Sequence, residues 1–562
     1  MSWKIRHKLK GLHEAETDLH GTGTGRGGAL SVCVVYPNEY RTGMGSLGFQ
    51  TVWRLFAEAD GIRSERAFLP SRDDSAEHRR SRTPLLSLES QTPLAQFDVI
   101  AFSISFEPDY LNIPVILNLA GIPLLAAGRS QSDPLILAGG AALFINPEPV
   151  ADFLDIICVG EGEEIVPGLV AALLSPRRDE TRQGLYSDLA RLPGFYIPAQ
   201  YRYRADGPEA GHTAAAGYPL PVVRATPVLA DHPPAATCIL ADQTEFGDMF
   251  LIEVSRGCPR GCRFCSSGFI YGAYRQQQYD HLLPLIDIGL KHRGRIGLVG
   301  AAVSDHAGIG RLCRHIVAQG GKVSVSSLRV DRIDSDMLDA LIASGHRTIS
   351  LAPEGGSQRL RDLIRKNLTE EQILETCELL ISRDILNLKL YFIIGLPTET
   401  GDDLEELIRL VTGIRERVIE RARGNRRLGE ITLSVNPFIP KPFTPFQWCG
   451  MEPLPSLEKK VRLLESRFRP LSNLRLKVES LRESYLQALL SRGDRRLTPL
   501  ITAMAEGTGI KAAARQHGVD TDWFVHRQIG GDEMLPWGII GTSDHIRLRA
   551  EYEKALQGRE EG

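Results

Sequence analysis

Three cysteines, Cys258, Cys262 and Cys265, lie close together near the middle of the chain and could hold a metal cluster. Their Cys-x-x-x-Cys-x-x-Cys spacing places three thiolates on one loop, and thiolates are the soft ligands that iron–sulfur clusters use. Three thiolates can bind three irons of a cubane, which leaves the fourth iron open to activate a small molecule. The alternative is a zinc ion with a distant fourth ligand, but structural zinc sites usually contain a second Cys or Cys/His pair, and the sequence has none. The spacing therefore predicts a 4Fe-4S cluster.

The residues around the cysteines fit the same chemistry. Gly257 and Gly261 let a loop curl tightly around a cluster. Phe264, directly before the third cysteine, could shield the cluster from water and tune its potential. The other cysteines are scattered along the chain, which is not the pattern of a disulfide framework.

The bulk composition is that of an ordinary globular protein. Of the 562 residues, 43% are hydrophobic and 24% are charged, and 66 basic against 69 acidic residues give a net charge of −3. This balance requires neither a nucleic acid nor an anionic membrane as partner, although the basic segment 415–429 leaves RNA contact open. Because the sequence contains no run of about 18 apolar residues and no secretory signal, we predict a cytoplasmic protein without a membrane span.

A series of strand-like and helical patterns surrounds the cysteine loop between residues 247 and 480. The expected strands are 249–255, 295–300, 322–327, 347–352, 387–395 and 430–438, with helical patterns between them. Such an alternation predicts a partial (β/α)6 barrel of the TIM type, which places its chemistry at the C-terminal ends of the strands. The cysteine loop directly follows the first of these strands.

A second α/β domain is predicted ahead of the barrel, over residues 29–175. Short apolar runs at 29–37, 97–105, 134–140 and 153–162 alternate with helical or mixed segments, which indicates a Rossmann-like open parallel sheet. The remaining segments are expected to be a poorly ordered leader at 1–28, a Pro- and Gly-rich linker at 176–246 and a helical C-terminal region at 481–562.

The cysteine spacing, the aromatic residue before the third cysteine and the position after a first barrel strand resemble the radical S-adenosylmethionine (SAM) superfamily. The resemblance covers roughly residues 246–480. It implies that the open iron binds the amino and carboxylate groups of SAM, and that reduction of the cluster cleaves SAM to a 5′-deoxyadenosyl radical. It also implies an electron donor such as flavodoxin or ferredoxin.

The same resemblance implies SAM-binding residues at later strand ends. Ser326 and Arg329 in SSLRVD, Glu354 in LAPEGG and Gly395 in YFIIGLPTET occupy the matching positions, with Arg365 or Lys366 near Glu354. Gly-rich loops after strands occur in any α/β barrel, so the order of these segments behind the cysteine loop is what favours the assignment. No catalytic side chain is assigned.

The first domain resembles the cobalamin-binding domain that precedes many radical SAM domains, as in NPEPVADFLD at 146–155 and VGEGEE at 159–164. Gly139, Gly140, Gly160 and Gly162 at its strand ends would let a flat, bulky ligand approach the backbone. The alternative is that these glycines only make turns. Many cobalamin domains carry Asp-x-His-x-x-Gly, whose histidine binds the cobalt from below. We identify no such motif in this sequence, and no histidine follows an expected strand of this domain. Bound cobalamin would therefore lack a histidine below the cobalt, or the domain has lost the cofactor.

The function that fits these features is that of a cobalamin-dependent radical SAM enzyme, which transfers a methyl group to an unactivated carbon of an unknown substrate. A cobalamin-free radical SAM enzyme is one alternative. A methylthiotransferase acting on tRNA or protein is another, but it would need three more cysteines in the first domain, where only Cys33 and Cys158 lie. The third is a non-enzymatic iron–sulfur redox or regulatory protein.

Overall fold

The computed structural model describes residues 1–21, 28–176, 181–204, 210–326, 328–425, 428–541 and 545–557. The chain forms two compact units, each assembled from segments distant in sequence. Unit 1 comprises Met1–Phe250, Leu490–Thr521 and Asp532–Ser543, and unit 2 comprises Leu251–Leu489, Asp522–Gly531 and Asp544–Gly562. The described part of the chain contains no helix that is long and apolar enough to span a bilayer.

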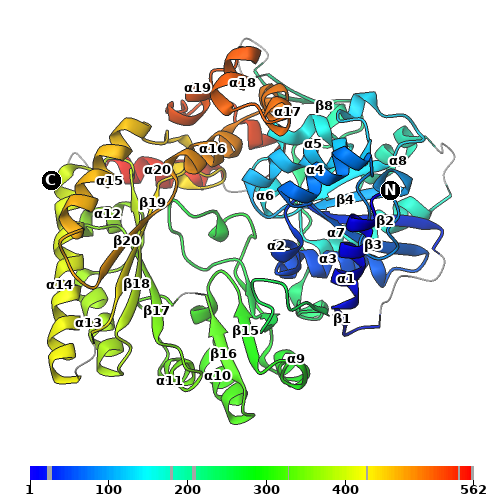
Figure 1. Ribbon diagram of the computed structural model, residues 1–562. Helices are drawn as coiled ribbons and strands as arrows, with labels where there is room; N and C mark the ends of the chain where they lie inside the picture. Colours follow the sequence, from blue (N-terminus) through cyan, green and yellow to red (C-terminus); the bar gives the residue numbers. More distant parts are fainter. Residues whose placement is uncertain are drawn as a thin grey trace. The chain divides into compact units, whose positions relative to one another are not determined.

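Unit 1 is built on a six-stranded sheet in the order β3-β2-β4-β5-β6-β7. Figure 1 labels β2, β3 and β4 of this sheet. Its strands are β2 (Leu30–Tyr36), β3 (Ile62–Phe68), β4 (Val99–Ser103), β5 (Leu135–Gly139), β6 (Ile156–Cys158) and β7 (Phe195–Tyr196). The first five are parallel and β7 is antiparallel. In chain order the parallel strands lie 2-1-3-4-5, a doubly wound arrangement whose switch point lies between β2 and β4.

The edge strand β3 was absent from the sequence prediction, because its sequence IRSERAF does not form an apolar run. Glu65 and Arg66 are nevertheless buried. Arg66 donates to Glu16 at 2.6 Å and its backbone N–H donates to Glu89 at 2.7 Å. Partners from distant segments make a charged strand compatible with burial, and no local pattern reveals such partners.

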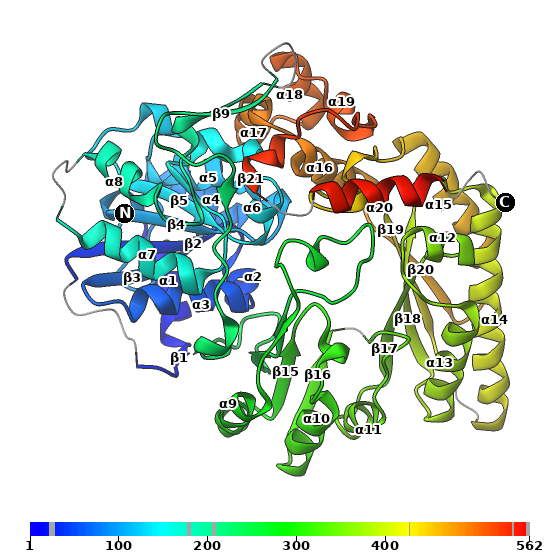
Figure 2. The ribbon, with the colours of Figure 1, turned by 180° about the vertical axis from the view of Figure 1, so that it is seen from behind.

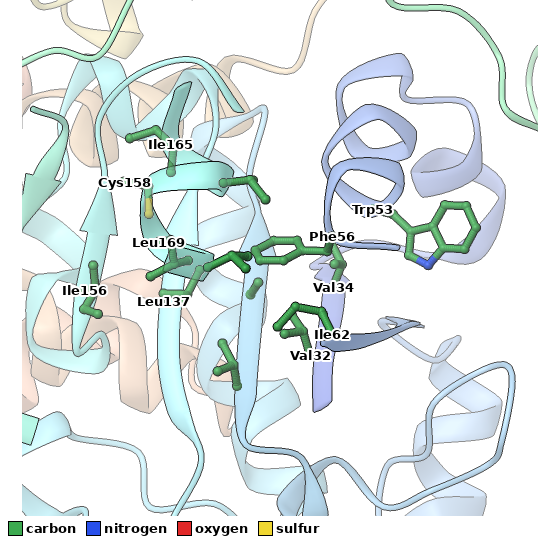
Figure 3. Close-up of a cluster of buried hydrophobic side chains, with 14 of the residues drawn as sticks. Val32, Val34, Trp53, Phe56, Ile62, Leu137, Ile156, Cys158, Ile165 and Leu169 are labelled. Atoms are coloured by element: carbon green, nitrogen blue, oxygen red, sulfur yellow. The ribbon is translucent and has the colours of Figure 1, made fainter. Parts of the chain in front are cut away.

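The core of unit 1 lies between the sheet and two helices, α3 (Leu47–Ala57) and α7 (Gly162–Leu174). Val32 and Val34 of β2, Trp53 and Phe56 of α3 and Leu169 of α7 belong to one buried cluster (Figure 3). Helix α3 begins at Ser46, whose side chain accepts a hydrogen bond from the Phe49 N–H at 3.3 Å.

Segments that we expected to be a leader and a linker are part of unit 1. Residues Trp3–Glu14 form helix α1, and β1 (Thr17–Asp18) pairs with β11 (Ile239–Leu240). Within residues 176–246 the chain also forms α8 (Arg182–Leu189), β7, the hairpin β8–β9 (Tyr201–Arg204, Gly211–Ala214) and β10 (Val222–Val223). Strand β10 pairs with β21 (Ile540–Gly541) from the end of the chain. Contacts with distant residues order these segments, and such contacts leave no local signature.

Unit 2 repeats strand and helix in the predicted order. Its strands are β12 (Phe250–Glu253), β15 (Arg295–Val299), β16 (Lys322–Val325), β17 (Thr348–Glu354), β18 (Asn387–Ile394), β19 (Ile431–Pro437) and β20 (Leu474–Val478). They form a three-stranded sheet, β12-β15-β16, and a four-stranded parallel sheet, β17-β18-β19-β20. A single bridge, Leu328 with Leu351, connects the segment after β16 to β17. The strands therefore divide into two sheets, so a continuous six-unit barrel stays a prediction.

Helices cover one face of the four-stranded sheet. The main helices of unit 2 are α9 (Tyr279–His292), α10 (Ile309–Ala318), α11 (Ser335–Ala343), α13 (Glu370–Ser382), α14 (Gly401–Asn425) and α15 (Leu454–Phe468). Figures 1 and 2 both show α13 and α14 on the same side of β17–β20. Successive strand residues point to opposite faces, so the buried Leu388, Leu390 and Phe392 face these helices. The alternate residues Lys389, Tyr391 and Ile393 lie on the other face, here called the inner face.

The C-terminal region is helical, as predicted, with α16 (Leu481–Arg492), α17 (Thr498–Ala505), α18 (Ile510–His517), α19 (Thr521–His526) and α20 (His545–Gln557). It does not form a separate domain. Residues Leu490–Thr521 belong to unit 1, whereas Asp522–Gly531 belong to unit 2.

Candidate active site

The cysteine loop follows a short strand, β13 (Ser255–Arg256), which pairs with β14 (Arg275–Gln276). Gly257 has φ +79°, a left-handed conformation that favours glycine. A Cβ atom on Gly268 would lie 2.6 Å from the carbonyl oxygen of Arg260, so only glycine lets the chain turn back so closely. The backbone N–H of Cys265 donates to the Cys262 carbonyl at 3.2 Å. The loop is therefore curled. Gly257 has the conformation that such a loop requires, whereas Gly261 is not among the residues with positive φ.

Charged side chains between the cysteines anchor the loop to the rest of unit 2. Arg260 forms ion pairs with Asp305 and, at 3.3 Å, with Asp331. Arg263 donates from Nη1 to the carbonyl of Leu363 at 2.8 Å and forms an ion pair with Glu551 at 3.1 Å. None of these ion pairs includes the sulfur atom of Cys258, Cys262 or Cys265.

Burial and nearby cations have opposite effects on the pKa of the thiols in the loop. Burial raises the pKa of the Cys258 and Cys262 thiols, and the charge of Cys265 raises both further. Lys366 lowers the pKa of Cys262, and Arg329 lowers the pKa of both thiols. Since cluster ligands are thiolates, these two cations favour the ligating form.

The donor set fits a cubane. Within the described ranges, no three His, Cys, Asp or Glu side chains are placed to hold one metal ion together. A cubane does not need that convergence, because each cysteine binds a different iron atom. Three cysteines on one curled loop beside two cations therefore suit a cluster with one open iron.

A cavity of about 470 Å³ lies beside this loop. It is on the inner face of the four-stranded sheet, at the C-terminal ends of the strands. Its lining residues are Phe264, Ser326, Ala352, Glu354, Tyr391, Ile393, Asn436, Pro437, Phe438, Ile439, Lys441 and Glu479. The structure thus brings Ser326 and Glu354 together with the aromatic residue of the cysteine loop. The volume is within the usual range of small-molecule pockets.

Glu354 has the most constrained backbone among the cavity residues. Its φ of +64° is rare for a residue other than glycine, and the register between β17 and β18 shifts between Leu351 and Glu354. Such strain persists only where the surroundings enforce it, and it is concentrated at functional sites. The Glu354 carboxylate lies 3.4 Å from Nζ of the buried Lys366, the same lysine that acts on Cys262. Arg365, the other basic residue considered beside Glu354, pairs with Glu551 at 3.3 Å.

Two other residues predicted from the sequence are not among those lining the cavity. Arg329 forms an ion pair with Asp331 at 3.0 Å. Gly395 has φ +75°, and its backbone N–H donates to the Glu399 carboxylate at 2.7 Å. Both have structural partners within the protein, and their contact with SAM stays a prediction.

Sequence reasoning missed Asn436, Lys441 and Glu479 as cavity residues. The signal that could have found Tyr391 and Asn436 was the alternation along β18 and β19. In NLKLYFII and ITLSVNP, every second residue is buried and the others are half-buried. No sequence pattern places Glu479, which follows the seventh strand, β20, a strand that we had not predicted.

The glycines expected to contact cobalamin have packing roles within unit 1. A Cβ on Gly140, at φ +116°, would lie 2.3 Å from the Ile104 carbonyl oxygen, and one on Gly160, at φ +146°, would lie 2.4 Å from that of Ala225. Added Cβ atoms on Gly139 and Gly162 would lie 3.3 Å from Cys158 and 3.2 Å from Val52. Internal packing is therefore enough to require glycine at 140 and 160. Cobalamin contact at these positions stays a prediction.

The strand ends of unit 1 are partly covered by its own chain. Asn146 donates to the carbonyls of Ser491 and Gly493 at 3.1 and 2.7 Å, and Ser491 donates to Glu107 at 2.8 Å. At the switch point, Asn38 donates to the buried Asp109 at 2.8 Å, and burial raises the pKa of Asp109 to about 6. Part of the predicted crevice is thus filled by residues 491–493.

A further sequence correction concerns histidine. The letters Asp18-Leu-His20-Gly-Thr-Gly do match Asp-x-His-x-x-Gly, but they precede β2 and do not follow any strand of the sheet. His20 is exposed, and residues 22–23 of the motif lie outside the described residues. His20 instead follows the two-residue strand β1, which pairs with β11 outside the six-stranded sheet.

Two family models match the chain, "Radical SAM proteins, N-terminal" over residues 48–198 and "Radical SAM superfamily" over residues 252–411. The second match contains the cysteine loop, Ser326 and Glu354. The chain belongs to the radical SAM superfamily. Membership implies a 4Fe-4S cluster and SAM as cofactors.

Relatives of this radical SAM protein cover it to different extents. It is 27% identical over 489 residues to uncharacterized protein MJ0966 of Methanocaldococcus jannaschii, a match that covers 86% of this chain and 94% of that protein. It is 28% identical over 288 residues to an anaerobic magnesium-protoporphyrin IX monomethyl ester cyclase of Cereibacter sphaeroides, covering 49% and 44%. A tRNA-2-methylthio-N(6)-dimethylallyladenosine synthase of Ehrlichia ruminantium is 29% identical over 189 residues, covering 29% and 40%. The chain thus spans less than half of these last two relatives.

Among solved structures, the methyltransferase TsrM of Kitasatospora setae with cobalamin and a [4Fe-4S] cluster is 13% identical. That match covers 94% of this chain and 99% of TsrM, with a TM-score of 0.49. The cobalamin-dependent enzyme OxsB is 17% identical. That match covers 68% of this chain and 52% of the OxsB chain, with a TM-score of 0.45.

Replacing Gly140 by Ala separates a packing role from a ligand role. The Cβ atom would collide with the Ile104 carbonyl at a φ that only glycine adopts readily, so we expect the unfolding free energy to fall by about 1–3 kcal/mol or more. Gly48→Ala is the control, because Gly48 is exposed in α3 with no atom within 4 Å, and this change should stabilise by about 0.5–1 kcal/mol. Thermal unfolding measures both. A Gly140→Ala protein as stable as the wild type would contradict the packing role.

Proposed function

We propose that this radical SAM protein is a cobalamin-dependent enzyme that generates a 5′-deoxyadenosyl radical and transfers a methyl group to an unactivated carbon. The observation that carries the radical part is the cavity that joins Phe264 of the cysteine loop to the strained Glu354. When bound, the cluster, SAM and cobalamin supply the radical and methyl-transfer chemistry, and the protein supplies binding, orientation and exclusion of water.

The residues of the cysteine loop and of the cavity would divide these tasks. Cys258, Cys262 and Cys265 would hold the cluster, which would supply an open iron for SAM. Glu354, held by Lys366, accepts hydrogen bonds from a cationic or hydroxyl group of SAM, and the Ser326 hydroxyl contributes a further polar contact. Apolar lining residues such as Phe264, Ile393 and Phe438 limit water around the reacting atoms.

The cobalamin part is supported by topology. A 2-1-3-4-5 parallel sheet binds ligands outside its strand ends at the switch point, here between β2 and β4. The described residues of that edge, such as Asn38 and Asp109, offer amide and carboxyl groups and no imidazole. We therefore expect any bound cobalamin to lack a protein nitrogen below the cobalt.

Among the alternatives, a methylthiotransferase is the least supported. It would need three further cluster-binding cysteines, and unit 1 contains Cys33, Cys158 and Cys238. All three are buried, and burial raises the pKa of Cys158 and of Cys238 to about 12, so these groups stay thiols. A cobalamin-free radical enzyme and a non-enzymatic redox protein stay open alternatives, and they differ in the assays below. In each enzymatic case an electron donor such as flavodoxin or ferredoxin is required.

Changing Cys258, Cys262 or Cys265 to Ala should abolish reductive cleavage of SAM. Anaerobically reconstituted wild-type protein should contain about four irons and four sulfides per chain. The matched control is Cys377→Ala, because Cys377 is buried in α13 away from the loop and should not affect cleavage. Formation of 5′-deoxyadenosine with dithionite is the measurement. If the triple Ala variant still made it, the cluster assignment would be wrong, and a cluster-containing wild type that never cleaves SAM would favour the redox protein.

Glu354→Gln should weaken SAM binding while the cluster is retained. Loss of a charge-assisted hydrogen bond costs roughly 1.5–3 kcal/mol, which corresponds to about a 10- to 150-fold loss of affinity. Glutamine keeps the shape of the side chain, and Glu479→Gln removes the other carboxylate of the same cavity as a control. Equilibrium binding of SAM to cluster-replete protein is the readout. Equal affinities for wild type and Glu354→Gln would remove Glu354 from the SAM site.

Anaerobic loading with cobalamin tests the methyl-transfer proposal. The electron paramagnetic resonance spectrum of the Co(II) state should show no nitrogen splitting from the lower face, because no histidine directly follows a strand of the six-stranded sheet in the described structure. Splitting that disappears in His20→Ala would instead assign this role to His20. Protein that cannot be loaded under any anaerobic condition would leave a cobalamin-free radical reaction as the better proposal.

A further inference from the structure

The inner face of the four-stranded sheet carries an unusual row of cations below the cavity. In the sheet register, Lys389 of β18 lies opposite Thr432 of β19, which lies opposite Arg475 of β20. Two residues further along the strands, and on the same face, the next cross-strand row consists of Tyr391, Ser434 and Lys477. The three cations of these two adjacent rows, Lys389, Arg475 and Lys477, are together called the basic row.

The basic row is continuous with the cavity. Tyr391, two residues after Lys389 on the same face, lines the cavity, and so does Glu479, two residues after Lys477. The Lys389 ammonium lies 4.6 Å from the centre of the Tyr391 ring, while Arg475 and Lys477 are exposed. A molecule in the cavity could therefore extend directly onto these cations.

No carboxylate neutralises this row within the described part of the chain. None of the three cations forms an ion pair there, whereas the buried Arg66, Arg263 and Lys366 each do. Three carboxylates belong to the inner face. Glu354 and Glu479 lie at the C-terminal strand ends, and Glu430, directly before β19, accepts a hydrogen bond from Thr432 at 3.3 Å but forms no ion pair with the basic row in the described structure. Glu354 is paired with Lys366. The pKa of Glu479 is raised by burial and by the charge of Glu483, an effect that Lys441 opposes only in part.

Protection of an edge strand explains only part of this arrangement. Charged side chains on an edge strand prevent pairing with other chains, and β20 is an edge strand that carries Arg475 and Lys477. Lys389, however, lies on β18, between β17 and β19, and is half-buried. A central strand has no edge to protect, so its lysine requires another explanation.

The spacing of the basic row suits a ligand with several negative charges. Neighbouring strands lie about 4.8 Å apart and same-face residues on one strand about 6.6 Å apart, so Arg475 lies about 10 Å from Lys389 and about 7 Å from Lys477 at the backbone. These separations let two or more phosphate groups each meet a cation. Arg binds phosphate through a planar fork and Lys through a point charge, and the Tyr391 ring offers a stacking surface beside them.

We propose that the substrate of this enzyme carries at least two phosphate groups, which bind the basic row while its reacting end occupies the cavity between Phe264 and Glu354. The inference rests on the proposed function, because it takes that cavity as the reaction site. Such phosphates belong either to a small phosphorylated molecule or to a short stretch of single-stranded RNA, and the chemistry of recognition is the same for both.

The test measures binding of two probes to cluster-replete full-length protein at several salt concentrations. The probes are inorganic tripolyphosphate and a fluorescein-labelled single-stranded RNA hexamer. The combined variant Lys389→Ala, Arg475→Ala, Lys477→Ala should bind both probes about tenfold or more weakly. For the RNA probe, the slope of log K against log salt should also fall in magnitude by about 2, which is about 0.7 for each lost phosphate contact with a single strand.

A matched variant removes three cations from elsewhere in unit 2. Lys459, Arg469 and Arg482 are exposed and form no ion pair in the described structure, so their triple change to Ala alters net charge equally and should leave binding and its salt slope unchanged. Iron content and the thermal midpoint verify that both variants are folded. Tripolyphosphate binding without RNA binding indicates a small phosphorylated substrate, and RNA binding indicates a nucleic acid.

The proposal is overturned if neither probe binds the wild type, or if both triple variants lose the same affinity, since general surface charge would then explain it. The binding assay needs no turnover. A wild type that binds the probes through the basic row but never cleaves SAM would therefore refute the proposed function and leave the anion site standing.

Discussion

A charged side chain that leaves water needs a partner of opposite charge. Ion pairs of this kind connect distant segments within each of the two units. In unit 1, Arg66 on an edge strand joins Glu16 of the N-terminal segment to Glu89. In unit 2, Arg260 and Arg263, which lie between the three cysteines in the sequence, anchor the cysteine loop through ion pairs. Both networks connect segments that are distant in the sequence. Within the basic row the same rule applies to Lys389, which is half-buried and forms no ion pair in the described structure, whereas Arg475 and Lys477 are exposed to water.

The cysteine loop depends on a balance between two opposing effects. Burial protects a cluster from water but disfavours the thiolates that must bind iron, and it raises the pKa of Cys258 and Cys262. Lys366 and Arg329 act in the opposite direction. Lys366 also pairs with the strained Glu354, so one buried cation serves both the cluster loop and the cavity.

The four-stranded sheet of unit 2 separates stability from chemistry by its two faces. Residues such as Leu390 and Phe392 are buried under helices, whereas Tyr391 and Ile393 line the cavity. The period of two that any strand imposes is enough to produce this division. In unit 1 close packing has a different consequence, because glycines such as Gly140 are required by neighbouring backbone.

The sequence by itself determined the cluster loop, the superfamily and the alternation of strands and helices, because these depend on spacing within short segments. The Cys258–Cys265 spacing and apolar runs such as LSVCVVY are local signals. Only the tertiary structure decided that β3 is a buried strand and that the leader and linker fold onto the first sheet. It also decided that Glu354 meets Lys366 and that Lys389 shares a face with Arg475. Ion pairs, register and cavity walls join residues far apart in the chain, and the free energy that selects them exists only once the chain has folded.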